Sequence, residues 1–231
     1  MTRFFVAGLI NIATTLAIVG FPLEYSPDNY PFFGIQTTVS GVGFNIAKAL
    51  TRLGNRVDFA SLIGKDGNGG LVRKRLNEEG ISDDLVLSHL EETAQSVIIY
   101  EKGGRRQIHT DLKDIQEHSF PTKSAEAALK KCDLAVICNI NFSRPLLGLA
   151  KEMGKPIATD VHAQSSLDDG YNKDYFEAAD ILFLSDEKLP GSPESVAREV
   201  MDRFSANIFV IGLGDKGALM AVRDDDFIGQ F

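Results

Sequence analysis

The sequence predicts a doubly wound α/β fold, in which a mostly parallel sheet forms the middle of three layers and helices cover both of its faces. Apolar runs typical of buried strands alternate with segments of helical periodicity along most of the chain. The apolar runs are continuous, as in parallel strands that are buried on both faces. A glycine-containing hairpin and two early strands fall outside this alternation, and they predict a second, smaller sheet.

Six apolar runs account for the predicted main sheet. The first lies within "MTRFFVAGLINIATTLAIVG", which is apolar enough to raise the question of a signal or membrane segment. Gly8, Asn11 and Thr14 interrupt it and no clear cleavage pattern follows, so we expect a buried strand followed by another strand, and no membrane partner. The expected strands are 3–10, 56–64, 134–140, 156–162, 180–186 and 207–214.

Helical segments lie between most of these runs. The clearest begins in "SGVGFNIAKALTRLG", where Ile46 and Leu50 belong to one apolar stripe and Lys48 faces away from it. Gly54 then ends the helix, as glycine commonly does after the last turn. The expected helices are 44–53, 68–79, 123–131, 143–153, 172–178 and 193–204.

The remaining strands predict a lid. Residues 12–19 and 34–40 have strand character, and "QSVIIYEKGGRRQIHTD" reads as a hairpin over about 95–110 that turns at Gly103-Gly104. A sheet of about four strands is too small to be stable alone, but it can lie over the crevice of a larger domain. We therefore expect residues 1–231 to form a single α/β domain with an inserted lid.

Composition excludes several classes of function. The formal net charge is −8 and no cluster of Lys and Arg offsets it, which argues against a nucleic-acid partner. Two cysteines, Cys132 and Cys138, fit neither a disulfide framework nor a metal pair, so we expect a cytoplasmic protein. The four histidines form no zinc-binding helical pair, and no G-x-S-x-G motif supports a catalytic triad.

Polar residues follow the apolar runs where a ligand site is expected. In open parallel sheets, ligands bind outside the carboxyl ends of the strands. The residues at these predicted ends are Asn11, Gly64, Lys65, Asp66, Asn139, Asn141, Asp160, His162, Asp186, Glu187 and Gly212 to Gly214.

The turn before the helix at 44–53 is the best local candidate. Gly41 and Gly43 indicate either a strained turn or a place where something approaches the backbone closely. A helix N-terminus directs amide groups and a positive dipole end at a polar or anionic ligand. We expect these amides and the Asn45 carboxamide to face a polar or anionic ligand.

Two other motifs predict turns rather than sites. "GLGDKG" at 212–217 is a literal G-x-G-x-x-G, but a dinucleotide site requires a helix next and an acidic residue about 20 positions on. Here "ALMAV" follows as a strand, which favours a turn between strands. The acidic run Asp224–Asp226 likewise predicts a solvated hairpin turn, not a metal site.

Within residues 40–80, glycines, an asparagine and an aspartate occur at fixed spacings around two helices and the strand between them. These spacings resemble the first signature of the ribokinase-like carbohydrate kinases, the PfkB family. "AGLINIA", "ADILFLSDE" and "VIGLGDKGALM" are similar to further segments of that family. The residues that match the first signature are Gly41, Gly43, Asn45, Ala47, Arg52, Leu53, Gly54, Gly64, Asp66, Gly69, Gly80 and Ile81.

The resemblance implies a kinase that uses ATP and Mg²⁺ to phosphorylate a hydroxyl of a sugar or sugar-like molecule. It places Asn11, Gly41, Gly43, Asn45 and Asn141 on the sugar side, to which we add Asp160 from its strand end. It also implies that the small sheet closes over the substrate and that two lids could pair in a homodimer. The residues it places towards ATP and magnesium are Asp186, Glu187, Gly212 and Gly214.

Departures from the family pattern limit these expectations. Ala13 stands where the family has a sugar-binding aspartate, which implies a different or less polar acceptor than ribose. The family's second signature, G-A-G-D opening a helix, is absent, and Asp215 in "GLGD" precedes a strand instead. We therefore assign no catalytic residue and no metal ligand, and we expect the sequence to be incomplete at its C-terminal end.

Three alternatives stay open at this point. The first is a nucleoside kinase of the same family, which Ala13 does not exclude. The second is a sugar- or nucleotide-binding protein without catalysis, and the third is an NAD-dependent dehydrogenase that uses the turn at 41–46.

Overall fold

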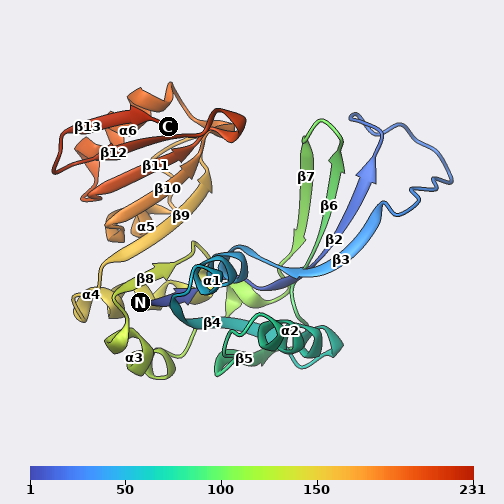
Figure 1. Cartoon of the computed structure of the whole chain (residues 1–231), viewed down its shortest axis with the longest axis horizontal. Coiled ribbons are helices and arrows are strands. Elements are labelled where there is room, and N and C mark those ends of the chain that lie inside the picture. Colours follow the sequence, from blue (N-terminus) through green and yellow to red (C-terminus); the bar gives the residue numbers. More distant parts are fainter.

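The computed structural model describes all residues, 1–231, and it contains two sheets (Figure 1). The larger sheet has nine strands in the order β13-β12-β11-β10-β9-β8-β1-β4-β5. Neighbours from β11 to β5 pair in parallel, whereas β12 and β13 add an antiparallel edge. These strands are β1 (Arg3–Ala7), β4 (Arg56–Gly64), β5 (Leu85–Leu90), β8 (Leu134–Ile137), β9 (Ile157–Ala163), β10 (Ile181–Ser185), β11 (Ile208–Gly212), β12 (Ala218–Val222) and β13 (Phe227–Gln230).

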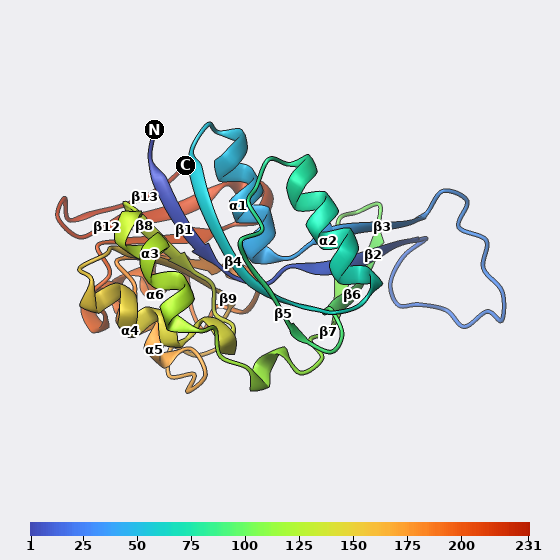
Figure 2. The same cartoon turned by 90° about the horizontal axis from the view of Figure 1, so that it is seen from below.

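Helices cover both faces of this sheet, as predicted (Figure 2). Successive residues of β1 enter opposite cores: Phe5 and Ala7 belong to the larger cluster, and Val6 belongs to the smaller one. The smaller cluster includes α1 and α2, and the larger one includes the other helices. The helices are α1 (Val42–Arg52), α2 (Gly67–Glu78), α3 (Thr122–Lys131), α4 (Pro145–Glu152), α5 (Lys173–Ala178) and α6 (Pro193–Arg203).

The second sheet has four strands in the order β3-β2-β6-β7, which confirms the predicted smaller sheet. Its central strands, β2 (Asn11–Ile18) and β6 (Gln95–Glu101), pair in parallel, and the edge strands β3 (Ile35–Ser40) and β7 (Arg106–Asp111) pair antiparallel to them. Residues 8–10 connect β1 to β2, and residues 91–94 connect β5 to β6. The small sheet therefore starts from the carboxyl ends of β1 and β5 and projects away from the main sheet (Figure 1).

The sequence prediction and the structure differ at a few elements. The prediction omitted β5, an edge strand whose run is interrupted by the polar residues Ser88 and His89. β1 ends at Ala7 rather than at residue 10, because residues 8–10 cross over to the small sheet. The acidic run Asp224–Asp226 forms the turn between β12 and β13, as predicted. None of the helices combines the length and hydropathy needed to cross a membrane.

Candidate functional site

The N-terminus of α1 packs directly on the connection between the two sheets. Gly41 has a φ of 111°, which side chains rarely adopt, and a Cβ added there would collide with the Leu9 carbonyl oxygen. A Cβ added at Gly43 would lie 2.5 Å from the Gly8 carbonyl carbon. The Phe44 N–H donates to the Leu9 oxygen at 3.2 Å. The glycines therefore allow a strained turn and a close approach, and the approaching group is the chain's own backbone.

A line of polar side chains crosses the base of the small sheet beside this turn. Asn45, at the start of α1, makes a long contact of 3.5 Å from Nδ2 to Ser40 Oγ in β3. Ser40 lies opposite Asn11 in the β2–β3 pair, and Asn11 Nδ2 donates to Ser96 Oγ in β6 at 3.1 Å. We call Asn45, Ser40, Asn11 and Ser96 the polar row. Four different elements bring it together.

Asn11 is the informative member of the polar row. Its side chain is 4% exposed and its Oδ1 atom has no hydrogen-bond partner. Ser61 in β4 and Arg75 in α2 also contain a buried polar atom without a partner, but Asn11 alone among the three lies in the polar row. Leaving a buried acceptor unpaired costs about 1–3 kcal/mol. The unpaired oxygen therefore points to a ligand that donates a hydrogen bond.

Asp66 ties the small sheet to α2. Its Oδ1 accepts hydrogen bonds from the Gly69 N–H at 2.8 Å and from Thr93 Oγ1 at 2.6 Å, and its Oδ2 accepts from the Thr93 N–H at 3.1 Å. Burial alone would raise the pKa of the Asp66 carboxyl, but the hydrogen bonds from Thr93 and Gly69 outweigh burial and lower that pKa below its ordinary value. Asp66 thus caps α2 and fixes the segment that leads into β6.

Asp160 lies in the middle of β9, three residues before that strand ends at Ala163. Its Oδ1 accepts the His162 N–H at 2.8 Å, in an irregular stretch where His162 has a φ of 59°. The parallel β8–β9 pair matches Val136 with Ala158, so Cys138, just after β8, lies beside Asp160 in β9. Burial raises the pKa of Cys138 to about 12, with a further contribution from the Asp160 charge. A Cβ added at Gly8 would lie 2.6 Å from Cys138 Sγ. Cys138 and Gly8 therefore connect Asp160 to the turn at the start of α1.

Asn141 has structural partners at both ends of its carboxamide. Its Nδ2 donates to the Gln116 carbonyl at 3.1 Å, and its Oδ1 accepts from Arg144 Nη2 at 3.3 Å. The Arg144 guanidinium also lies over the rings of Tyr171 and Tyr175, at 5.0 and 4.8 Å from their centroids. Asn141 therefore holds the segment after β8 in place, and we do not include it in the proposed acceptor site.

The four residues expected to face the nucleotide lie together at another part of the rim. Asp186 and Glu187 follow β10 in a short 3₁₀ turn, and the end of β10 pairs with Gly212 at the end of β11. Gly214 has a φ of 62°, and a Cβ there would meet no atom within 4 Å. The strands β9, β8 and β1 separate this group from the polar row.

The carboxylates available for Mg²⁺ are few. No group of three or more His, Cys, Asp or Glu side chains could hold a metal ion. Mg²⁺ bound to a nucleotide takes one or two protein carboxylates, while phosphate and water oxygens complete its coordination. The exposed pair Asp186 and Glu187 fits that arrangement and does not form a metal cage.

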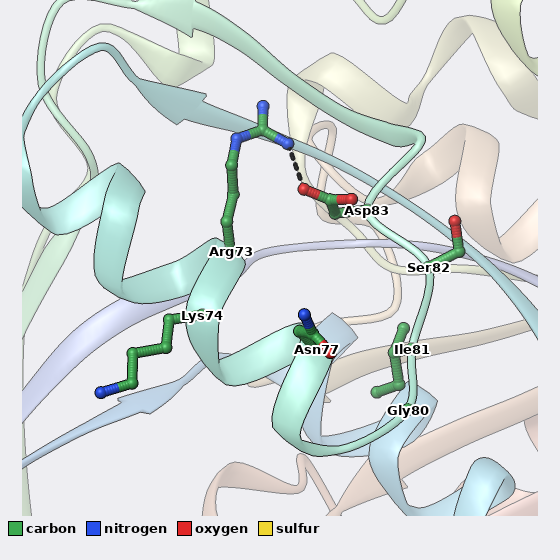
Figure 3. A pocket seen from close by; sticks show the side chains of 7 residues that line it. All are labelled: Arg73, Lys74, Asn77, Gly80, Ile81, Ser82 and Asp83. Atoms are coloured by element: carbon green, nitrogen blue, oxygen red, sulfur yellow. Dashed lines mark hydrogen bonds and ion pairs between the residues drawn. The ribbon is translucent and has the colours of Figure 1, made fainter.

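The hollow at the end of α2 is a weaker candidate (Figure 3). It measures about 460 Å³, and two of its lining residues, Arg73 and Asp83, already pair with each other. Arg73 donates to Asp83 Oδ2 at 2.6 Å, to the Val86 carbonyl at 2.8 Å and to Ser88 Oγ at 3.0 Å. These bonds give Arg73 a structural role in joining α2 to β5.

No sequence pattern indicates Ser96 or Thr93 as functional. Neither belongs to a motif, and both lie in or next to a hairpin that was expected to serve as a lid. Only the cross-strand register, which pairs Ser96 with Ala13, places Ser96 beside Asn11. The strands β2 and β6 are adjacent in space but about 85 positions apart in sequence, so local patterns could not predict this contact.

Comparisons with known proteins agree on one family. The sequence model described as pfkB family carbohydrate kinase matches residues 1–228. The acarbose 7(IV)-phosphotransferase of Actinoplanes sp. is 24% identical over 231 residues, which are 100% of this chain and 76% of that relative.

Solved structures show the same fold. A microbiome-derived acarbose kinase superposes with a TM-score of 0.85 at 23% identity, over 100% of this chain and 76% of the other. Ribokinase from Giardia lamblia gives a TM-score of 0.81 at 14% identity, over 99% of this chain and 74% of the other. The chain thus spans about three quarters of the length of these relatives.

Proposed function

Because the chain belongs to the pfkB family of carbohydrate kinases, we propose that it takes part in ATP-dependent phosphorylation of a hydroxyl on a sugar or sugar-like small molecule. The observation that carries this proposal is the buried Asn11 oxygen without a partner. A sugar hydroxyl supplies the missing donor, and it can accept a hydrogen bond from a neighbouring side chain at the same time. We also propose a cytoplasmic location.

The polar row and its surroundings form the proposed acceptor site. Asn11 accepts a hydrogen bond from a substrate hydroxyl, and Asn45 and Ser40 extend the row towards α1. Because Gly41 and Gly43 have no side chain, the start of α1 can pack against the backbone of residues 8–10, which brings Asn45 and Ser40 close to Asn11. Asp160 borders the same part of the rim and contributes a carboxylate to it. In this proposal the small sheet acts as a lid that excludes water from the acceptor.

The ends of β10 and β11 form the proposed nucleotide side. ATP supplies the phosphoryl group and carries Mg²⁺, whose charge offsets that of the phosphates. Asp186 and Glu187 would hold the Mg²⁺ that accompanies the phosphates, while the backbone at Gly212 and Gly214 leaves open space beside them. The contribution of this chain is then positioning, since an acceptor and a donor that are held in fixed orientation react as if they were one molecule. We assign no catalytic base among residues 1–231.

The proposed acceptor class is a neutral glycoside or pseudo-oligosaccharide. The curated relative and a solved structure are both named for acarbose, and both match the whole length of this chain. Ala13 adds no charge beside Asn11, which suits an uncharged acceptor. A nucleoside is the second candidate, because a nucleoside kinase solved in complex with inosine has the same fold, with a TM-score of 0.75.

A panel assay tests the proposal. The full-length gene product is incubated with Mg-ATP and, separately, acarbose, maltotriose, ribose, adenosine or inosine, and phosphorylated products are identified by mass spectrometry. We expect a product with acarbose or maltotriose and a saturable titration of the same sugar by calorimetry. Binding of a sugar without any product would reject the kinase and favour a binding protein. Saturable quenching by NADH, with no response to any sugar, would instead support a dehydrogenase.

A further inference from the structure

The face of the small sheet that carries Asn11 continues into a second row of side chains. Ala13 in β2 lies opposite Thr38 in β3 and opposite Ser96 in β6, and Ser96 lies opposite Thr110 in β7. Directly opposite residues project from the same face of a sheet. The bond from Asn11 to Ser96 shows that the two rows share one face. Thr38, Ala13, Ser96 and Thr110 therefore form a hydroxyl row across all four strands, adjacent to the polar row.

The hydroxyl row contains no charged group. It consists of three hydroxyls around the methyl group of Ala13, which is 1% exposed. Ser96 is 7% exposed, and its Oγ accepts the hydrogen bond from Asn11 Nδ2. A serine hydroxyl that accepts a bond in this way still has its own hydrogen to donate. Ser96 thus offers a free donor next to the unpaired acceptor of Asn11.

This donor and acceptor pair restricts the chemistry of a bound sugar. A carboxylate accepts hydrogen bonds only, so it favours two adjacent hydroxyls that both donate. Asn11 Oδ1 accepts a hydrogen bond and the Ser96 hydroxyl donates one. Together they complement a ligand in which a hydrogen-bond donor lies beside an acceptor. A hydroxyl next to a ring oxygen or a glycosidic oxygen has this pattern.

We infer that Ser96 is a specificity-determining residue that, together with Asn11, selects a glycoside presenting a hydroxyl beside an ether oxygen. This inference rests on the proposed function and names the substrate class of the same site. If Ser96 served only to satisfy Asn11 Nδ2, it would support the fold and would not alter the choice of ligand. A structural role and a specificity role therefore differ in whether the affinities for two sugars change in parallel.

Calorimetric titration of matched variants separates these roles. The variants are Ser96→Ala, Asn11→Ala and, as a control, Thr14→Ala, whose side chain bonds to Thr37 on the opposite face of the same sheet. The probes are acarbose, maltotriose and ribose, and the melting temperature of each variant is measured in parallel. We expect Ser96→Ala to weaken binding of the better glycoside about fivefold to tenfold, in line with the loss of one hydrogen bond. We expect Thr14→Ala to bind within twofold of the unmodified protein.

A gain of preference gives the second readout. Ala13→Asp places a carboxylate between Asn11 and the hydroxyls of Thr38 and Ser96. We expect this change to shift the ratio of ribose affinity to glycoside affinity at least tenfold towards ribose, because a carboxylate favours adjacent hydroxyls as donors. If Ser96→Ala lowers the melting temperature too far for titration, the ratio of ribose affinity to glycoside affinity in the Ala13→Asp variant tests the inference instead.

The outcomes distinguish this inference from the proposed function. If Asn11→Ala weakens glycoside binding while Ser96→Ala leaves it unchanged, Ser96 does not determine specificity and the proposed function stands. An unchanged ratio in a folded Ala13→Asp variant would also overturn the inference. If the unmodified protein binds none of the sugars, the proposed function itself fails.

Discussion

At the scale of single residues, Asp66 and Asn11 show two opposite uses of a polar side chain. The Asp66 carboxylate receives three hydrogen bonds, from Gly69 and twice from Thr93, so its charge is well stabilised. Asn11 has one bond through Nδ2 and none through Oδ1. A residue with all its partners in the chain supports the structure, whereas one with a missing partner is available to a ligand. This contrast assigns Asp66 to the scaffold and supports Asn11 as a member of the proposed acceptor site.

The scaffold role of Asp66 predicts a pH-dependent loss of stability. We expect Asp66→Ala to lower the free energy of unfolding by about 1–2 kcal/mol at pH 7, the usual cost of losing a helix N-cap. Since the pKa of the folded carboxyl is lowered, its contribution is complete above the ordinary pKa of aspartate and is lost as the pH falls through the lowered value. The stability difference from the unmodified protein should therefore shrink below about pH 4.

Urea denaturation at a series of pH values measures this difference. Asp202→Ala is a suitable control, because Asp202 is an exposed carboxyl in α6. A constant gap between Asp66→Ala and the unmodified protein from pH 7 to pH 3 would show that the carboxylate charge does not contribute.

At the scale of elements, most helices and central strands could be predicted from local patterns. The strand β4 has the predicted bounds, and α1, α2, α3 and α6 begin or end within two residues of their predicted positions. The edge strand β5 was missed, because strong apolar runs mark only strands that are buried on both faces. Strand ends and the glycine turn indicate Asn11 and Asn45, which the structure places in the polar row. Ser96 depends on the register between β2 and β6, which local sequence does not specify.

The packing of α1 against residues 8–10 predicts that Gly43 does not tolerate a side chain. We expect Gly43→Ala to lower the free energy of unfolding by about 1–3 kcal/mol, the usual effect of overpacking, because the added Cβ would lie 2.5 Å from the Gly8 carbonyl carbon. Gly70→Ala in α2 is the matched control, since a Cβ there meets no atom within 4 Å. That control should be neutral or more stable by up to about 1 kcal/mol.

Thermal and urea denaturation of the two alanine variants give the comparison directly. Equal stability of Gly43→Ala and Gly70→Ala would mean that α1 can move away from the connection between the sheets without cost.

At the scale of the whole molecule, the small sheet leaves apolar side chains exposed on its strands. Ile35, Val97 and Ile108 on its strands are 59%, 45% and 50% exposed. The loop between β2 and β3, at the far end of the small sheet (Figure 1), adds several exposed aromatic side chains. They are Tyr25, Tyr30, Phe32 and Phe33. Ile35 and Val97 lie on one face of the small sheet and Ile108 lies on the other, so a second copy of the chain, paired through the small sheet, would cover part of this surface.

This surface predicts a homodimer in solution. Light scattering coupled to gel filtration should give twice the chain mass at micromolar concentrations. The double variant Ile108→Asp, Phe33→Ser should shift the protein to a monomer, because a charge and a polar group replace apolar contact area. Leu71→Ser, at an exposed apolar residue of α2, should leave the dimer intact. A monomer in the unmodified protein would contradict the pairing of the small sheets.

The most direct measurement is the affinity of Asn11→Ala for the sugar that the unmodified protein binds best, determined by titration calorimetry. If Asn11 Oδ1 accepts a hydrogen bond from the acceptor, the variant should lose about tenfold in affinity, or about 1.4 kcal/mol, while ATP affinity stays within twofold. Thr14→Ala, on the opposite face of β2, should bind the sugar normally. An Asn11→Ala variant that is folded and binds the sugar as tightly as the unmodified protein would contradict the assignment of the polar row as the acceptor site.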